Sequence, residues 1–216
     1  LIYRKKGDIV YHNGNLTYKG TNNAYQGKYN KKGELKGFVG KAARALDKIR
    51  TGGEAGKELI NYFQSSFEKN ISIKKGSENG ESSGRISWNP TARNSDIPNQ
   101  DGSNGRDPFI ALAHEIGHTW DRWEEQNTLI DATWYKAADG SIVKESERIA
   151  TWWENRIRAE NDVPLREFYS FLRGGNNHVI GEEAGRILLE GTRTSNQIDR
   201  GGSRTKQPNS LNYYRY

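Results

Sequence analysis

FIALAHEIGHTWDRW, at residues 109–123, governs both the architecture and the chemistry expected of this sequence. It contains HEIGH at residues 114–118, the pattern H-E-x-x-H. On an α-helix, residues four positions apart lie on one face, about 6 Å apart along the axis. His114 and His118 could therefore bind one zinc ion together. Glu115 could then act as a general base on a water at that ion.

The residues around this pattern favour a helix. Asp107 is a good helix cap, and Pro108 suits the first helical turn. Gly117 costs about 1 kcal/mol relative to alanine inside a helix, so we expect another element to pack close to it. The alternative is an amphipathic helix with histidines near the core boundary. Against it, two of the four histidines of the chain fall in this one pattern.

The composition limits the kind of zinc site. The chain has 216 residues and no cysteine, which excludes disulfides, thiolate ligands and a cysteine nucleophile. Zinc would have to be held by histidines and carboxylates.

No apolar run reaches the length of a membrane span. There is no methionine and residue 1 is leucine, so we expect a piece of a longer precursor; the start, LIYRKKGD, is charged too early for a secretory signal peptide.

The net charge of +6 is unevenly distributed. Residues 1–60 carry 13 Lys/Arg and 5 Asp/Glu, whereas residues 107–163 carry 6 and 12. An acidic section around the motif suits a metal or a basic substrate segment better than a nucleic acid. We therefore do not expect nucleic acid as a partner. A basic nucleic-acid-binding or nuclease module that uses residues 1–60 remains the alternative.

The pattern along the chain predicts an α+β fold. A β-rich extension, residues 1–35, carries an Asn13-Gly14 hairpin signal. A metallopeptidase domain is expected over residues 36–200 and a polar tail over residues 201–216. Within the domain we expect helices over 36–50, 54–68 and 145–161, and strands over 70–73 and 84–90. We also expect a polar loop at 76–84 and a hairpin at Asp139-Gly140. An edge strand could pair with an extended substrate, and residues 84–90 are our candidate for it.

A catalytic zinc ion needs a third protein ligand. The longer pattern H-E-x-x-H-x-x-G-x-x-H fails, because Asp121 and Glu124 stand where glycine and histidine should be. His12 and His178 have no local motif. The remaining candidates are carboxylates of the helix expected over 145–161, namely Glu145, Glu147 and Glu154. Glu147 and Glu154 are seven residues apart and share a face, whereas Glu145 points about 160° away from Glu147.

Three motifs in order resemble the NleD-like effector zinc metallopeptidases, a family found also as C-terminal toxin domains of RHS-type polymorphic toxins. These proteins show H-E-x-x-H, then E-N-x-x-R, then P-x-R-x-x-Y. The matching residues here span roughly residues 107–170 and are His114, Glu115, His118, Glu154, Asn155, Arg158, Pro164, Arg166 and Tyr169. The resemblance implies a zincin-like fold with a small mixed or antiparallel sheet and an active-site helix. It also implies Glu147 as the third, gluzincin-type ligand, with Glu145 as the alternative.

The resemblance also implies roles for the later motifs. Arg166-x-x-Tyr169 is similar to a pair in clostridial neurotoxin proteases that lies over the zinc water. Tyr169 or Arg166 would then stabilise the oxyanion, and Glu154, Asn155 and Arg158 would orient the metal ligands. The alternative is that Arg166 pairs with a surface acid and Tyr169 packs in the core.

Together these features predict a zinc-dependent endopeptidase with one Zn²⁺ per chain. By the resemblance, it would be a secreted or translocated bacterial toxin or effector that cleaves a protein in a target cell. Such modules imply a cognate immunity protein in the producing cell. A non-catalytic domain stabilised by zinc is a further alternative, and it would need a fourth protein ligand.

Overall fold

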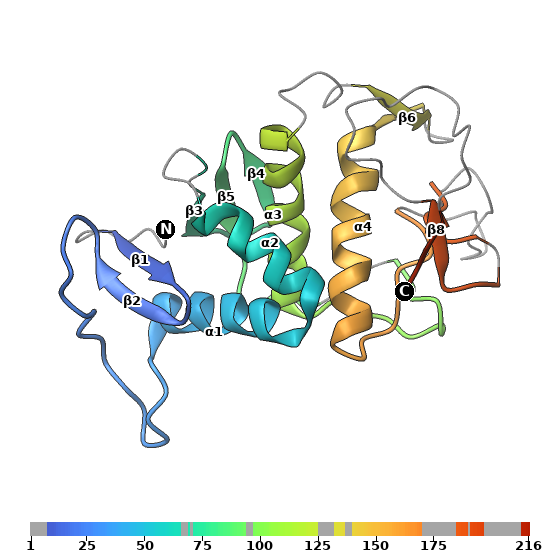
Figure 1. The fold of residues 1–216 in the computed structure, drawn as a ribbon. Helices are drawn as coiled ribbons and strands as arrows, with labels where there is room; N and C mark the ends of the chain where they lie inside the picture. Colours follow the sequence, from blue (N-terminus) through green and yellow to red (C-terminus); the bar gives the residue numbers. More distant parts are fainter. Residues whose placement is uncertain are drawn as a thin grey trace.

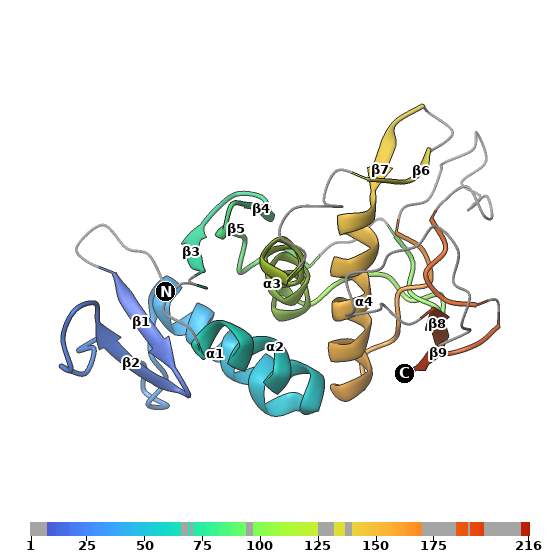
Figure 2. The same ribbon diagram turned by 45° about the horizontal axis from the view of Figure 1, so that its top comes forward.

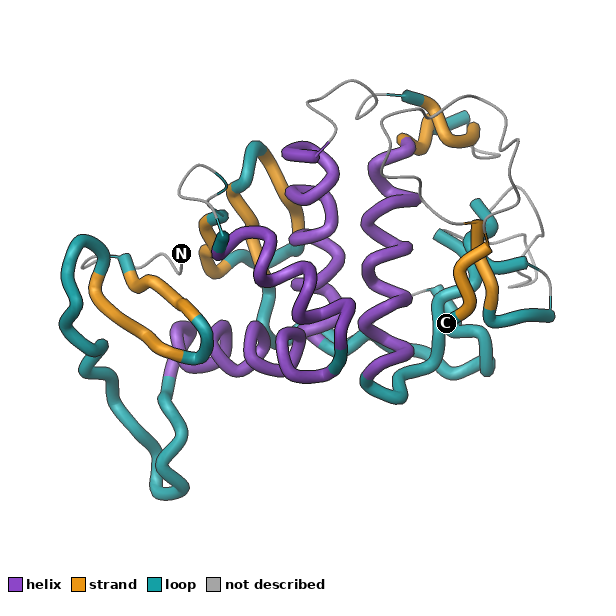
Figure 3. The backbone as a smooth tube through the Cα atoms, viewed as in Figure 1, coloured by secondary structure: helices purple, strands orange, loops and turns teal. Residues whose placement is uncertain are grey.

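The described part of the chain contains four helices, which form the centre of the molecule, and short strands around them (Figure 1, Figure 3). The computed structural model describes residues 8–65, 69, 71–93, 97–124, 132–136, 140–169, 185–189, 191–196 and 213–216. The helices are α1 (Gly37–Gly52), α2 (Glu54–Gln64), α3 (Pro108–Glu124) and α4 (Glu145–Glu160). The predicted α+β class is confirmed. None of the described helices is long and apolar enough to cross a lipid bilayer.

Helix α3 carries the H-E-x-x-H pattern and lies between α4 and a small sheet (Figure 1). It packs closely on α4. A Cβ at Gly117 would lie 3.1 Å from Cα of Ala150 and 3.2 Å from Cβ of Trp153. Gly117 therefore allows the two helices to approach each other closely. This confirms the expectation that another element packs against this glycine. Trp153 is fully buried at this contact.

The sheet beside α3 has three strands in the order β3-β5-β4. They are β3 (Ser72–Lys75), β4 (Gly80–Ser82) and β5 (Arg85–Trp88). Strand β5 pairs with β3 in parallel and with β4 antiparallel, so it is central. Our assignment of residues 84–90 as a substrate-pairing edge strand is therefore wrong. The edge strand that faces α3 is β4, which lies in the segment 76–84 that we expected to be a loop.

A β-ribbon precedes the helices. Strands β1 (Ile9–His12) and β2 (Asn15–Tyr18) pair antiparallel, and Asn13 and Gly14 both have positive φ at the turn. The predicted hairpin is thus confirmed. The ribbon contributes Ile9 and Tyr11 to the main core, and the Tyr11 hydroxyl donates a hydrogen bond of 2.7 Å to Asp47 of α1.

The two helices that follow the ribbon are joined by a tight turn. Helix α2 ends at Gln64, earlier than the expected residue 68; residues 66–68 lie outside the described part. The start of α2 is held by α4, because the Glu160 carboxylate accepts hydrogen bonds from the backbone N–H groups of Ala55 and Gly56, at 2.6 and 3.1 Å. This contact fixes the α1–α2 pair against the end of α4.

The remaining strands form two small hairpins. Strands β6 (Thr133–Lys136) and β7 (Ile142–Lys144) pair antiparallel just before α4, as the hairpin signal indicated, although Asp139 lies outside the described part. Strands β8 (Thr194–Asn196) and β9 (Tyr213–Arg215) also pair, at the opposite end of the molecule from the ribbon (Figure 2). Strand β9 falls within the polar tail expected over residues 201–216, of which residues 201–212 lie outside the described part.

Candidate metal and catalytic site

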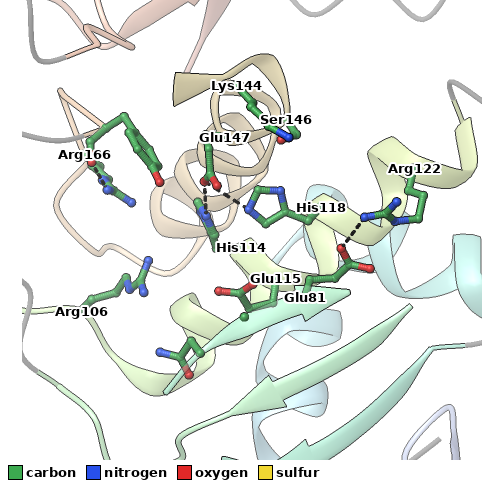
Figure 4. A pocket seen from close by; sticks show the side chains of 13 residues that line it. Glu81, Arg106, His114, Glu115, His118, Arg122, Lys144, Ser146, Glu147 and Arg166 are labelled. Carbon is green, nitrogen blue, oxygen red and sulfur yellow. Dashed lines mark hydrogen bonds and ion pairs between the residues drawn. The ribbon is translucent and has the colours of Figure 1, made fainter. Parts of the chain in front are cut away.

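The two histidines of α3 converge with one carboxylate of α4. Nε2 of His114 lies 3.3 Å, and Nε2 of His118 lies 3.2 Å, from Oε2 of Glu147 (Figure 4). The two imidazole rings are 4.8 Å apart and nearly perpendicular. All three donor atoms lie within 4.8 Å of one another. This arrangement arises because α3 and α4 pack closely at Gly117, one residue before His118.

This group fits a metal ion. In a tetrahedral site with bonds of about 2.0–2.1 Å, neighbouring donor atoms are about 3.3–3.4 Å apart. The two separations from Glu147, 3.2 and 3.3 Å, are close to this value. Burial raises the pKa of the Glu147 carboxyl, but its hydrogen bonds with His114 and His118 outweigh burial and hold the pKa well below its ordinary value. Glu147 is therefore an anion, as a metal ligand must be.

Glu154 lies on the other side of the His114 ring. Its Oε2 is 3.0 Å from Nδ1 of His114. A carboxylate in this position favours the tautomer with a proton on Nδ1, which leaves the lone pair of Nε2 directed at the metal site. Burial alone would lower the pKa of His114, but Glu147 and Glu154 raise it above its ordinary value.

Glu154 is fully buried and contacts three guanidinium groups. Arg158 donates to it at 2.8 Å, Arg166 at 3.3 Å and Arg106 at 3.4 Å. Burial raises the pKa of Glu154, but these three cations outweigh burial, so the pKa lies well below its ordinary value. Glu154 thus stays charged in the core and links the His114 ring to the arginines.

Asn155 and Arg158 hold the segment that carries the last motif. The Asn155 side chain exchanges two hydrogen bonds with the backbone of Arg166, both of 2.8 Å. Arg158 donates to the carbonyl of Pro164 at 2.7 Å. The polar residues of the E-N-x-x-R motif therefore contact either His114 or the P-x-R-x-x-Y segment. In this way they hold that segment next to the histidines.

Arg166 and Tyr169 belong to the segment that Asn155 and Arg158 hold, and both line the site. The Arg166 guanidinium donates to Glu154 and to the carbonyls of Phe168 and Tyr169. Burial first, and then the negative charge of Glu147, raise the pKa of the Tyr169 hydroxyl far above its ordinary value. Tyr169 is therefore a neutral hydrogen-bond donor near Glu147.

Glu115 faces the same space from α3. It is buried, and burial raises its pKa, while the positive charges of His114, His118 and Arg106 oppose this shift. Its carboxylate lies beside the histidines without an ion pair to either (Figure 4).

These side chains line an open cleft of about 530 Å³ between β4 and α4. Arg106 and Arg166 lie at one side of the histidine pair, and Arg122 lies at the other (Figure 4). Arg122 is paired at 3.2 Å with Glu81 of β4, whose side chain is nearly inaccessible. The remaining lining residues are Asn79, Gly80, His114, Glu115, His118, Lys144, Ser146, Glu147 and Tyr169.

A family model described as an effector protein, Peptidase M91, matches residues 26–169, about two thirds of the chain. The chain belongs to the M91 family of effector peptidases. The resemblance to the NleD-like effectors is thus confirmed. No curated protein and no solved structure was found to match the chain. The match ends at Tyr169, the last residue of the third motif.

The other ligand candidates of this M91 peptidase lie elsewhere. Glu145 pairs with Arg148 at 2.6 Å and is not part of the converging group. His12 lies at the exposed end of β1, in the ribbon. His178 lies outside the described residues.

Three residues in or behind the M91 cleft carried no recognisable signal in the sequence. Arg106 precedes the helix cap Asp107 without a motif of its own, and Glu81 falls in a segment rich in glycine and serine. Asn99, which accepts a hydrogen bond of 3.0 Å from Arg158, comes from a long polar loop. No periodicity or spacing pointed to these positions, because each reaches the site through loop or edge-strand geometry.

Proposed function

We propose that this chain is a zinc-dependent endopeptidase that acts as a translocated effector or toxin. The observation that carries the proposal is the convergence of His114, His118 and Glu147 beside Glu115 in an open cleft. Two imidazoles, one carboxylate and no thiolate form a donor set typical of catalytic zinc. We assign His114, His118 and Glu147 as the residues that would hold one Zn²⁺.

A bound zinc ion would supply a Lewis acid and lower the pKa of a water to about 7. In this proposal Glu115 accepts the proton of the attacking water and later donates it to the leaving amine. Its place in the cleft, one residue from His114 and without an ion pair to any described residue, supports this role. Glu154 keeps the His114 ring in one orientation during the cycle.

We assign the hydrogen bond to the tetrahedral oxyanion to Tyr169. The Arg166 guanidinium already donates hydrogen bonds to Glu154 and to two backbone carbonyls. Arg166 is therefore better suited to position Tyr169 than to contact the substrate. Asn155 and Arg158 would support the same segment through their contacts with Arg166 and Pro164.

The substrate is expected to lie along β4. Among the described strands, β4 pairs only with β5, so one of its edges is open to an additional strand. Gly80 and Glu81 of β4 line the cleft. Backbone pairing at such an edge would hold an extended segment of a protein substrate across the metal site.

The family description supports delivery of the chain into a target cell, where it would cleave a host or competitor protein. As for related toxin modules, we propose a larger secreted or translocated precursor and an immunity protein in the producing cell. Two alternatives are less well supported. A structural zinc site would need a fourth protein ligand, and the described residues converge as a group of three. A nucleic-acid module would rely on the basic residues 1–60, away from the cleft.

The Glu115→Gln variant tests the proposal. It should bind zinc as the wild type does and lose cleavage by about 10²–10⁴-fold, the contribution of a general base. Glu145→Gln is the matched control, because Glu145 pairs with Arg148 outside the metal group and should leave both zinc binding and cleavage unchanged. Cleavage that survives Glu115→Gln would refute the mechanism.

A further inference from the structure

Behind one side of the cleft, three arginines surround a single carboxylate. Arg106, Arg158 and Arg166 all pair with the single carboxylate of Glu154, and their side chains are only 21%, 1% and 6% exposed. Among the described residues, no other carboxylate forms an ion pair with any of the three. Buried charges are costly unless they are paired, so this cluster should attract a further anion.

Two of the three arginines have their donors engaged within the protein. Arg158 binds Glu154, the Asn99 side chain and the carbonyl of Pro164. Arg166 binds Glu154 and two carbonyls of its own segment. These contacts hold both guanidinium groups in place and leave them few N–H donors for a ligand.

Arg106 differs from these two arginines. Its guanidinium has five N–H donors. The only side-chain hydrogen bond that it forms with a described residue is one of 3.4 Å to Glu154. It lines the cleft beside His114 and Glu115 (Figure 4). No ion pair joins it to Glu115. Arg106 is thus the member of the cluster with donors available at the site.

Arg122, a second arginine of the cleft, is less suited to bind an anion. Arg122, on the opposite side of the histidine pair, is balanced by the buried carboxylate of Glu81 at 3.2 Å. A pair of this kind ties β4 to α3 and adds no net charge to the cleft. Arg122 therefore adds nothing to the excess of arginines around Glu154.

We infer that Arg106 binds a carboxylate of the substrate close to the scissile bond, so that the peptidase prefers an acidic side chain there. This inference rests on the proposed peptidase function and adds a substrate class to it. The geometry suits it, because a planar guanidinium can bind a carboxylate through two parallel hydrogen bonds. The same chemistry could be supplied by a C-terminal carboxylate, and the experiment below separates the two sources.

The test is a cleavage-site profile of the zinc-loaded enzyme on a peptide library, read by mass spectrometry, with free and amidated C-termini compared. Wild type should cleave peptides with Asp or Glu at one fixed position near the cut, about 10- to 100-fold better than those with Asn or Gln, which is the worth of one charge-assisted hydrogen bond. Arg106→Gln should lose this ratio, which compares acidic with neutral peptides within the one variant and so does not depend on its overall rate. Arg106→Lys should retain part of this ratio, and Arg106→Glu should favour Lys or Arg at that position.

Arg93→Gln is the control, because Arg93 is exposed and pairs with Asp107 outside the cleft. Its profile should match the wild type. A preference seen only with free C-termini would identify the terminal carboxylate instead and overturn the side-chain preference. An active wild type without acidic preference, or an Arg106→Gln variant that keeps it, would refute the inference and leave the proposed function intact. A wild type that cleaves no peptide would refute the proposed function and the inference with it.

Discussion

Nδ1 of His114 lies 3.0 Å from Oε2 of Glu154, while Nε2 of the same ring lies 3.3 Å from Glu147. Two carboxylates seven residues apart on α4 therefore contact both nitrogens of one imidazole. Helical geometry makes this possible, because seven residues are close to two turns and place both side chains on the same face. One carboxylate can serve as a metal ligand and the other can orient the ring.

Glu154→Gln should weaken both zinc binding and folding. The amide cannot balance Arg106, Arg158 and Arg166, so we expect a loss of about 3–5 kcal/mol in the free energy of unfolding, as when one partner of a buried ion pair is removed. Zinc affinity should fall by about 10- to 100-fold. Denaturant unfolding and competition with a metal chelator measure the two effects.

Glu167→Gln is the control for this variant, since the pair of Glu167 with Arg186 is partly exposed. It should change stability by less than about 1 kcal/mol and leave zinc affinity unchanged. Unaltered zinc affinity in Glu154→Gln would show that Glu154 does not orient the ligand.

Tyr169→Phe should reduce kcat by about 10²–10³-fold, the typical cost of one oxyanion donor. KM and zinc content should change little, because the hydroxyl would act mainly in the transition state. Steady-state kinetics on a cleaved peptide, together with metal analysis, provide the measurement. A rise in KM at constant kcat would instead place Tyr169 in ground-state binding of the substrate.

Glu160→Ala should destabilise the protein without affecting the metal site. It removes the carboxylate that accepts the N–H groups of Ala55 and Gly56 at the start of α2, so we expect a loss of about 1–2 kcal/mol, as for a helix N-cap. Exposed Glu78→Ala is the control and should stay within about 0.5 kcal/mol of wild type. Equal stability of the two variants would argue against Glu160 as the cap.

Tyr11 should make stability fall at alkaline pH. Burial and the hydrogen bond to Asp47 raise its pKa from 10.0 to about 12. Because the folded-state pKa is raised, the stabilisation is complete below pH 10 and is lost as the pH rises through 12. Tyr11→Phe should cost about 1 kcal/mol at neutral pH and flatten the decline between pH 10 and 12. Unfolding by denaturant at several pH values gives the result; an unchanged slope in Tyr11→Phe would assign the decline to other groups.

Local patterns predicted the fold well where one segment determined its own structure. The Asn13-Gly14 turn, helix α3 and helix α4 each contain their signals within a short stretch, and all were confirmed. The edge strand β4 was missed because its residues, Gly80–Ser82, have low strand propensity and are held by pairing with β5. The strand conformation of β4 thus depends on its tertiary contacts and not on its local sequence.

The candidate site also contains residues that a single helix determines and residues that depend on how the helices pack. The spacing of His114 and His118 is encoded in one helix, and the three carboxylate candidates for the third ligand could be named from the next. Only the packing of α3 on α4 shows that Glu147 converges with the histidines while Glu145 pairs with Arg148. Arg106 could not be found from sequence, because its importance depends on how many arginines share one buried carboxylate.

The metal content of purified protein tests the central claim most directly. Elemental analysis should find about one zinc per wild-type chain, as expected for a site with two histidines and one carboxylate. Glu147→Ala should lose the metal, and Glu145→Ala should retain it. Absence of zinc from the wild type after reconstitution, or its retention in Glu147→Ala and loss in Glu145→Ala, would contradict the site proposed here.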